Sequence, residues 1–174
     1  MEAAWKHFDK PFETKMRQHI YKSKDIRGYE PMHGANVDPN TEGGSFAIFN
    51  ERKILSTNAN IDRKESFLFN WEPECEPVLP QLTVEQRALL HENLWPDDDP
   101  GFKQACYKHD RHMVVLLLKM IQMFALGLDL DEHYFDEKVT HPLASCKMIH
   151  YPPQDPTSND ETGIGAHTDF VCKS

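Results

Sequence analysis

The stretch from Asp99 to Gly127 constrains the fold of this chain more than any other segment. Asp99 is a residue type that caps helix N-termini, and Pro100 suits the first helical position, where a missing N–H costs nothing. A helical pattern then continues to Leu126, and Gly127 is typical of a helix end. The sequence therefore predicts one long helix with a wide buried apolar stripe. The apolar positions of this helix include Cys106, Met113, Leu116, Leu117, Met120, Ile121 and Phe124.

Shorter elements are predicted before this helix. Residues 1–20 have apolar side chains at helical spacing, and Pro11 predicts a break or kink among them. Glycines and prolines predict a loop over residues 23–44, whereas the alternation over residues 64–69 is typical of a short strand. A short helix is expected to begin at Thr83, which suits the N-cap position.

Strands are concentrated after the helix. Asp131 can cap a second short helix over residues 132–137. Residues 143–151 are predicted to form a strand that two prolines end, and residues 164–171 are predicted to form another. Helices and irregular segments come first and strands come last, which predicts an α+β fold.

Composition narrows the function classes. A chain of 174 residues that is 39% apolar and 27% charged fits one soluble globular domain. The net charge of -9 argues against a nucleic-acid partner. The four cysteines form no C-x-x-C pair, which argues against zinc and favours reduced thiols in a cytoplasmic protein. The amino terminus has no signal-peptide core, and no apolar stretch is long enough for a membrane span.

One short motif carries metal chemistry. His167 and Asp169 are two residues apart in a predicted strand, so both side chains point to the same face. An imidazole and a carboxylate on one face are two of the three ligands in a two-histidine, one-carboxylate Fe(II) site, which leaves open positions for substrate and oxygen. Taken alone, the spacing fits a polar surface turn better than a metal site, because short motifs often match by chance.

Several further segments resemble one enzyme family and occur in the family's order. They are Phe8 to Lys15, Arg27-Gly28-Tyr29-Glu30-Pro31, Asp62-Arg63-Lys64-Glu65-Ser66-Phe67, Asn93-Leu94-Trp95-Pro96, Ala125-Leu126-Gly127-Leu128 with Tyr134-Phe135, His150-Tyr151-Pro152-Pro153 and Gly163-Ile164-Gly165-Ala166-His167-Thr168-Asp169. Each is weak alone. Together they cover most of the chain, which resembles the isopenicillin N synthase-like branch of the 2-oxoglutarate and Fe(II)-dependent dioxygenases. The resemblance favours metal binding over a surface turn for His167 and Asp169.

The resemblance implies a fold and a set of site residues. It implies a double-stranded β-helix, or jelly roll, preceded by a mostly helical region. Residues 1–140 would form the helical region, and residues 141–174 would form the first strands of an incomplete jelly roll. His167 and Asp169 would bind Fe(II), and Tyr151 would hydrogen-bond the co-substrate 2-oxoglutarate. For Tyr151, a strand-end tyrosine at the sheet surface is an equal alternative, and no catalytic residue beyond these is assigned.

Other polar residues near these motifs have structural explanations. His150 is not expected in the site, because strand alternation turns it to the opposite face from Tyr151. Glu65 is expected to be a structural ion-pair carboxylate rather than an acid catalyst. His109 and His112 are expected on the surface of the long helix rather than at a metal.

The family pattern also includes residues that these 174 residues do not supply. A distal histidine completes the iron site in the family, and an arginine further along pairs with the 2-oxoglutarate carboxylate. Neither follows Asp169 here. The chain is therefore expected to be a fragment of an oxygenase that hydroxylates, desaturates or cyclises a small molecule, and to be inactive alone. Fe(II) and 2-oxoglutarate are expected to bind it poorly.

Two alternatives belong beside this interpretation. A non-catalytic binding or regulatory module would keep the helical half in order to pair with a full-length relative. An oxidase of the isopenicillin N synthase type would use no 2-oxoglutarate. For the fragment itself, an incomplete jelly roll would expose apolar surface and strand edges, so self-association is expected.

Overall fold

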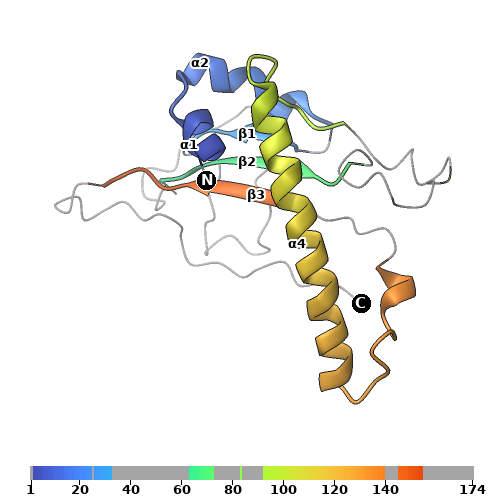
Figure 1. Cartoon of the computed structure of the whole chain (residues 1–174). Coiled ribbons are helices and arrows are strands. Elements are labelled where there is room, and N and C mark those ends of the chain that lie inside the picture. Colours follow the sequence, from blue (N-terminus) through green and yellow to red (C-terminus); the bar gives the residue numbers. More distant parts are fainter. Residues whose placement is uncertain are drawn as a thin grey trace, which may run out of the picture. The chain divides into compact units, whose positions relative to one another are not determined.

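The computed structural model combines short helices, one long helix and a small sheet (Figure 1). It describes residues 2–24, 26–32, 63–72, 83, 92–139 and 145–154. For this part of the chain the predicted α+β class is confirmed. The helix predicted to begin at Thr83 lies outside the described residues apart from Thr83 itself, and the strand predicted over residues 164–171 lies wholly outside them.

The chain forms two compact units. One unit contains Met1–Gly28 and Leu68–Lys147, and the other contains Tyr29–Phe67 and Met148–Ser174. The domain boundary predicted at residue 140 lies outside the described residues and stays a prediction.

Two short helices open the first unit, α1 (Glu2–Phe8) and α2 (Phe12–Lys15). Pro11 stands between them as the N-cap of α2, which confirms the predicted break, since proline has no N–H to continue a helix. The Nζ atom of Lys15 donates to the carbonyl oxygen of Phe8 at 2.8 Å and ties the two helices together. Two 3-10 turns follow, η1 (Met16–Gln18) and η2 (Ile20–Lys22).

Three strands form one sheet in the order β1-β2-β3. They are β1 (Gly28–Glu30), β2 (Glu65–Asn70) and β3 (Ser145–His150). β2 confirms the strand predicted over residues 64–69, and β3 confirms the described part of the strand predicted over residues 143–151. β1 is a correction, because the sequence predicted a loop where this strand lies.

Gly28 explains why β1 was predicted as a loop. Its φ angle is +116°, in a region that L side chains rarely adopt. A Cβ atom at this position would also clash with the carbonyl oxygen of Gln18. A glycine is therefore required here both for the backbone angle and for the close approach, although it begins a strand.

Side-chain contacts establish the strand directions. Ser66 Oγ donates to Glu30 Oε2 at 2.7 Å, so the start of β2 meets the end of β1. His150 Nδ1 lies 2.8 Å from Glu65 Oε1, so the start of β2 also meets the end of β3. Strands β2 and β3 are therefore antiparallel.

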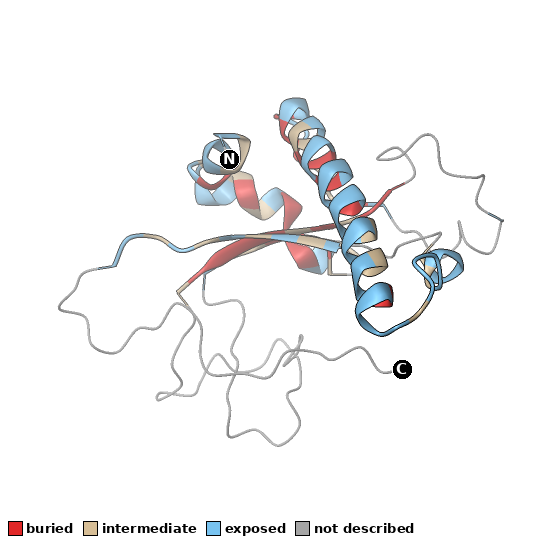
Figure 2. Cartoon of the chain, turned by 60° about the horizontal axis from the view of Figure 1, so that its bottom comes forward, coloured by how far each residue is buried: buried red, intermediate tan, exposed pale blue. Residues whose placement is uncertain are grey.

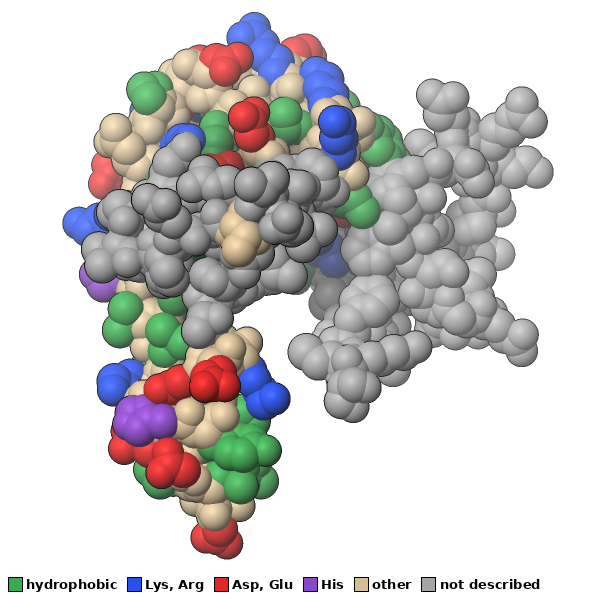
Figure 3. All heavy atoms as spheres, turned by 90° about the vertical axis from the view of Figure 1, so that its right-hand side faces the viewer, with side chains coloured by type: hydrophobic (Ala, Val, Ile, Leu, Met, Phe, Trp, Pro, Cys, Tyr) green, Lys and Arg blue, Asp and Glu red, His purple; other side chains and the backbone are tan. Residues whose placement is uncertain are grey.

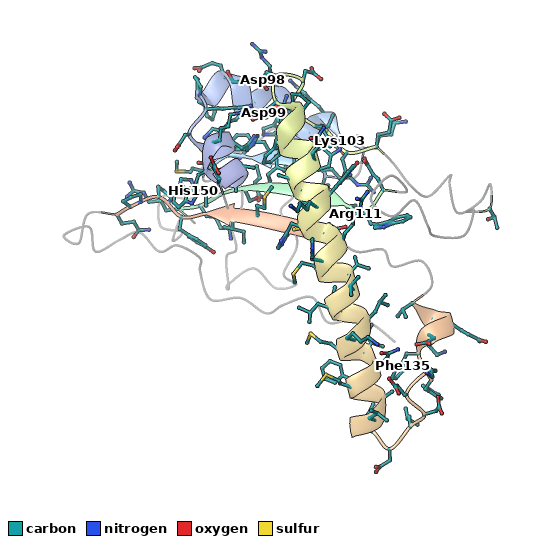
Figure 4. The ribbon with its side chains drawn as sticks, viewed as in Figure 1. Asp98, Asp99, Lys103, Arg111, Phe135 and His150 are labelled. Carbon is teal, nitrogen blue, oxygen red and sulfur yellow. The ribbon has the colours of Figure 1, made fainter. Side chains whose placement is uncertain are left out.

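The predicted long helix is present as α4 (Pro100–Gly127), and its cap is the expected one. Asp99 Oδ1 accepts the N–H of Phe102 at 3.2 Å. The Nζ atoms of Lys6 and Lys10 lie 3.1 and 3.6 Å from Asp99 Oδ2. One carboxylate therefore caps α4 and links its first turn to α1 and the residues that follow α1 (Figure 4).

The first half of α4 packs against aromatic rings of the same unit. Phe102 stacks on His7 with ring centroids 4.4 Å apart. Trp95 lies edge-on to Tyr107 at 5.3 Å and tilted against Phe69 at 5.2 Å. Figure 2 shows buried residues, in red, along one side of this helix. Full burial of a phenylalanine side chain, as for Phe69 and Phe102, contributes about 1.5–3 kcal/mol, so this cluster is a main source of stability in the unit.

The second half of α4 corrects the predicted stripe. Cys106 is buried as expected, but five residues of the stripe are exposed: Met113, Leu116, Leu117, Met120 and Phe124. The buried residues of α4 form a different line: Phe102, Cys106, Tyr107, Asp110, Val114 and Ala125. The reason is that residues 113–128 are mostly apolar around the whole helix, so spacing cannot select the buried side. Figure 3 shows hydrophobic side chains at the surface in the lower part of the molecule, where α4 ends.

None of the helices in the described ranges is both long and apolar enough to cross a lipid bilayer.

The α-helix predicted over residues 132–137 is not present, and turns occupy this segment instead. Turns are followed by a single 3-10 turn, η4 (Asp136–Lys138). Asp131 Oδ1 accepts the N–H of His133 at 2.9 Å, and His133 Nδ1 lies 2.8 Å from Asp136 Oδ2. Such local side-chain bonds compete with helical backbone bonds, which accounts for the turn.

Asp99→Ala is expected to lower the free energy of unfolding by about 1–2 kcal/mol, because it removes the cap of α4. Urea unfolding followed by circular dichroism measures this loss. Asp98→Ala is the matched control, since Asp98 is more exposed and contacts Lys10 at the surface. Its loss is expected to stay within about 0.5 kcal/mol, and equal losses for the two variants would contradict the capping role.

The pKa of Asp99 supplies a second measurement. Burial alone would raise this pKa, but the hydrogen bond from Lys6, the charges of Lys10 and Lys6 and the N–H of Phe102 hold it below its usual value. A carboxyl with a lowered pKa in the folded state stabilises the fold above its unfolded pKa, near about 3.9, and this contribution is lost as pH falls. The stability difference between the wild-type chain and Asp99→Ala should therefore shrink on acidification.

Candidate functional site

The three residues predicted for the site fall into two groups. His167 and Asp169 lie outside the described residues, so their role as iron ligands stays a prediction. Tyr151 follows β3 directly, and its side chain is 46% exposed. Among the residues that the structure describes, no group of three His, Cys, Asp or Glu could hold a metal ion.

Strand β3 separates two kinds of environment. Cys146, Met148 and His150 are partly buried, whereas Ser145, Lys147 and Ile149 are exposed. Tyr151 continues the exposed row, and prolines follow it. The predicted alternation between His150 and Tyr151 is therefore confirmed, and the side chain of Tyr151 is accessible beside Ile149.

A buried carboxylate joins all three strands next to Tyr151. Glu65 is the first residue of β2 and is 2% exposed. Its Oε2 accepts the hydroxyl proton of Tyr29 at 2.6 Å, and its Oε1 lies 2.8 Å from Nδ1 of His150. Tyr29 belongs to β1, and His150, labelled in Figure 4, ends β3. One side chain therefore connects the sheet from edge to edge.

Burial determines the protonation of this network. An ionised carboxylate removed from water is costly unless it accepts hydrogen bonds, and bonds to a charged acceptor are strong. Burial, followed by the hydrogen bond and the charge of Glu65, raises the pKa of Tyr29 far above its usual value. Tyr29 therefore keeps its proton and donates it. An ionised Glu65 can only accept hydrogen bonds, so its contact with His150 requires the tautomer that carries a proton on Nδ1.

The expected structural role of Glu65 agrees with its 2.8 Å contact to His150 Nδ1, which is an ion pair only when the imidazole is protonated. The partners themselves were not anticipated. The available signal was that Tyr29, Glu65 and His150 stand in three separate segments that carry the family resemblance. A histidine that faces inward from a strand end also needs a polar partner.

A second pair of titratable groups lies in the other unit. Asp110 is 4% exposed on α4, and burial raises the pKa of its carboxyl against the opposing charge of His109. Burial and then the charge of Asp110 raise the pKa of the Cys146 thiol. A raised pKa points away from a nucleophilic role at neutral pH. His109 and His112 are exposed on the same helix, as expected.

Tyr29→Phe is expected to lower the free energy of unfolding by about 1–3 kcal/mol, because Glu65 loses a buried donor. Tyr29 has a raised folded-state pKa, so its contribution is complete below pH about 10 and is lost as pH rises further. The variant should therefore lose less stability between neutral and alkaline pH than the wild-type chain. Urea unfolding at several pH values measures both effects. Tyr21→Phe removes the same hydroxyl from a side chain that is 63% exposed, and an equal effect there would contradict the assignment.

The chain is similar to known enzymes over nearly its whole length. It is 28% identical over 178 residues to the 2-oxoglutarate-Fe(II) type oxidoreductase hxnY of Emericella nidulans, an alignment that covers 99% of this chain and 45% of that enzyme. It is 37% identical over 127 residues to isopenicillin N synthase of Streptomyces clavuligerus, covering 70% of this chain and 35% of the synthase. No protein-family model matches the chain.

A solved structure shares the fold. Full-length T7H of Neurospora crassa, crystallised with alpha-KG, has a TM-score of 0.64 and 24% identity, covering 97% of this chain and 46% of T7H. The chain thus spans about half, or less, of the length of the proteins it matches. With the fold and the order of segments in agreement, the chain belongs to the isopenicillin N synthase-like family, which contains the 2-oxoglutarate-Fe(II) type oxidoreductases.

Proposed function

We propose that this chain is part of an oxygenase that uses Fe(II), 2-oxoglutarate and O2 to hydroxylate, desaturate or cyclise a small molecule. The observation that carries the proposal is the His167-Thr168-Asp169 motif. It lies in a chain that is similar along nearly its whole length to a 2-oxoglutarate-Fe(II) type oxidoreductase. The free thiols of Cys106 and Cys146 support a cytoplasmic location, where thiols stay reduced.

The residue types suit the proposed ligands. An imidazole and a carboxylate, from His167 and Asp169, are two of the three donors in the Fe(II) sites that oxygenases use. Iron held in this way supplies open coordination positions for co-substrate and oxygen. The accessible side chain of Tyr151 offers a hydroxyl donor to a carboxylate of 2-oxoglutarate. Residues 141–174 would begin the jelly roll that carries this site.

The proposal also sets a limit on these 174 residues by themselves. A pair of protein ligands binds divalent metals weakly and with little selectivity, because affinity and selectivity depend on ligand number and geometry. The dicarboxylate co-substrate would further lack an arginine clamp of the kind that holds carboxylates in two-point contacts. We expect weak Fe(II) binding and no turnover from this chain alone.

Metal titration tests the ligand assignment. Calorimetry with Fe(II) under anaerobic conditions should show weak binding by the wild-type chain and a loss of about tenfold or more in His167→Ala or Asp169→Ala, since each removes one of two donors. His109→Ala is the matched control, because this histidine is exposed on α4. Unchanged binding in both ligand variants would contradict the assignment, and robust formation of succinate from 2-oxoglutarate would contradict the expected inactivity.

A second candidate function is a non-catalytic module that associates with itself or with a full-length relative. The observation that favours it is the exposed apolar second half of α4, where Met123 is 70% and Phe124 is 63% exposed. A helix that is apolar on all sides is normally buried on all sides. Contiguous apolar surface of this kind marks interaction sites.

Association can be measured directly. Sedimentation of the wild-type chain should show a concentration-dependent oligomer, and Met123→Lys combined with Phe124→Lys should shift it toward monomer, since the two charges oppose burial. Lys119→Glu is the matched control, because it changes the charge of an already polar residue on the same helix. A wild-type chain that remains monomeric at high concentration would contradict self-association.

A further inference from the structure

We propose that Glu65, acting through His150, is a positioning residue for Tyr151. The inference rests on the proposed function of Tyr151 as the contact to the 2-oxo dicarboxylate co-substrate. The three residues lie in the same compact unit of the chain. Glu65 itself faces away from the exposed row of β3, so its effect on a ligand would pass through the backbone of the strand end.

The first step is the anchoring of the strand end. His150 is the last residue of β3, and its Nδ1 is held 2.8 Å from Glu65 Oε1. The histidine side chain is 16% exposed and Glu65 is 2% exposed, so water competes little for this contact. Holding the imidazole fixes the backbone of His150 at the point where sheet pairing ends.

The second step passes this restraint to the next residue. Tyr151 is joined to His150 by one planar peptide, and Pro152 follows with its own φ angle fixed near about −65°. Proline also restricts the residue before it to extended conformations. Tyr151 therefore has an anchored residue on one side and a rigid one on the other, and its side chain is directed to the exposed face.

The third step is the rigidity of Glu65 itself. Tyr29 donates to its second oxygen at 2.6 Å, and Tyr29 is 1% exposed. Because both oxygens are engaged by separate strands, the carboxylate cannot rotate without breaking a buried bond. Displacements of about 1 Å at a binding group can cost about 100-fold in rate, so a fixed anchor has functional value.

The same unit offers a matched control on neighbouring residues. Glu30 accepts from Ser66 Oγ at 2.7 Å, which is also a carboxylate contact between β1 and β2. Tyr29 and Glu30 are successive strand residues, as are Glu65 and Ser66, so this second contact lies on the opposite face of the sheet. Loss of Glu30 should therefore disturb the sheet without releasing His150.

The test is made on the full chain without metal or co-substrate. Nuclear magnetic resonance of the chain labelled on tyrosine rings and histidine nitrogens reports both groups, with Tyr151→Phe assigning the Tyr151 signals. In Glu65→Gln, the His150 nitrogen and Tyr151 ring signals should both shift, while signals from α4 stay in place and show that the unit containing α4 remains folded. In Glu30→Gln, the Tyr151 signals should stay in place. Unchanged Tyr151 signals in Glu65→Gln, or equal shifts in the two variants, would overturn the proposal.

A second pair of variants guards against a folding defect in Glu65→Gln. His150→Ala removes the donor and should shift the Tyr151 signals. His150→Asn keeps an N–H donor near the position of Nδ1 and should restore them toward the wild-type values. Rescue by asparagine is not expected if His150 only fills space, and its failure would overturn the proposed route through this hydrogen bond.

Co-substrate titration separates this inference from the proposed function. Addition of 2-oxoglutarate together with Mn(II), which mimics Fe(II), should perturb the Tyr151 signals of the wild-type chain. The affinity for 2-oxoglutarate should fall about tenfold in Glu65→Gln, which is less than the loss of about 100-fold that a displacement of about 1 Å can cause. If Tyr151 does not respond in the wild-type chain at 2-oxoglutarate concentrations high enough to saturate a weak site, the proposed co-substrate role fails. The ligand-free spectra still decide whether Glu65 positions Tyr151.

Discussion

The buried carboxylate of Glu65 is the interaction on which the sheet of this chain depends. A charged group that has lost its water must be compensated by donors, and here the donors come from the strands on either side, through Tyr29 and His150. The sheet is small and β1 is short, so few backbone bonds hold it together. Removal of either donor would leave part of a buried charge uncompensated, which costs far more than the bond itself contributes. Strand pairing brings the two donors to Glu65, and the contacts of Glu65 in turn hold the three strands together.

Local rules predicted the elements whose ends are set by single residues. Asp99 caps the start of α4 because capping is a property of the residue and its immediate neighbours. Pro11 divides the first helices for the same reason. At the other end of α4 the expected stop at Gly127 is off by position, since Gly127 is still helical and Asp129 adopts the left-handed conformation, with φ 57°. β1 was not predicted because Gly28 is required by its close approach to the backbone of Gln18. A contact between these two segments cannot be inferred from the local sequence pattern. The buried side of α4 was also predicted wrongly. When a helix is apolar around its circumference, the side that is buried depends on the segments packed against it and not on residue spacing.

The candidate site shows the same division. Strand alternation was sufficient to place His150 and Tyr151 on opposite faces. It could not say that His150 meets Glu65, which is 85 residues away in sequence, because such a pairing depends on strand order. Family membership came from the order of short segments, and two of those segments proved to carry the ends of the His150–Glu65 contact. Residue identities thus supplied the candidates, whereas strand pairing supplied the partners.

The cap of α4 has a consequence for how the chain assembles. Asp99 and its neighbour Asp98 are held by lysines of the amino-terminal segment, and the contact between Lys10 and Asp98 closes a span of 88 residues. Long spans must lose loop entropy before such a contact forms, so they delay folding. The interior of α4 can form from local backbone hydrogen bonds. The ion pairs at its first turn, from Lys6 and Lys10 to Asp99 and Asp98, form only when the amino-terminal segment docks. Extensions or deletions at the amino terminus would therefore act at a distance, on the start of the longest helix.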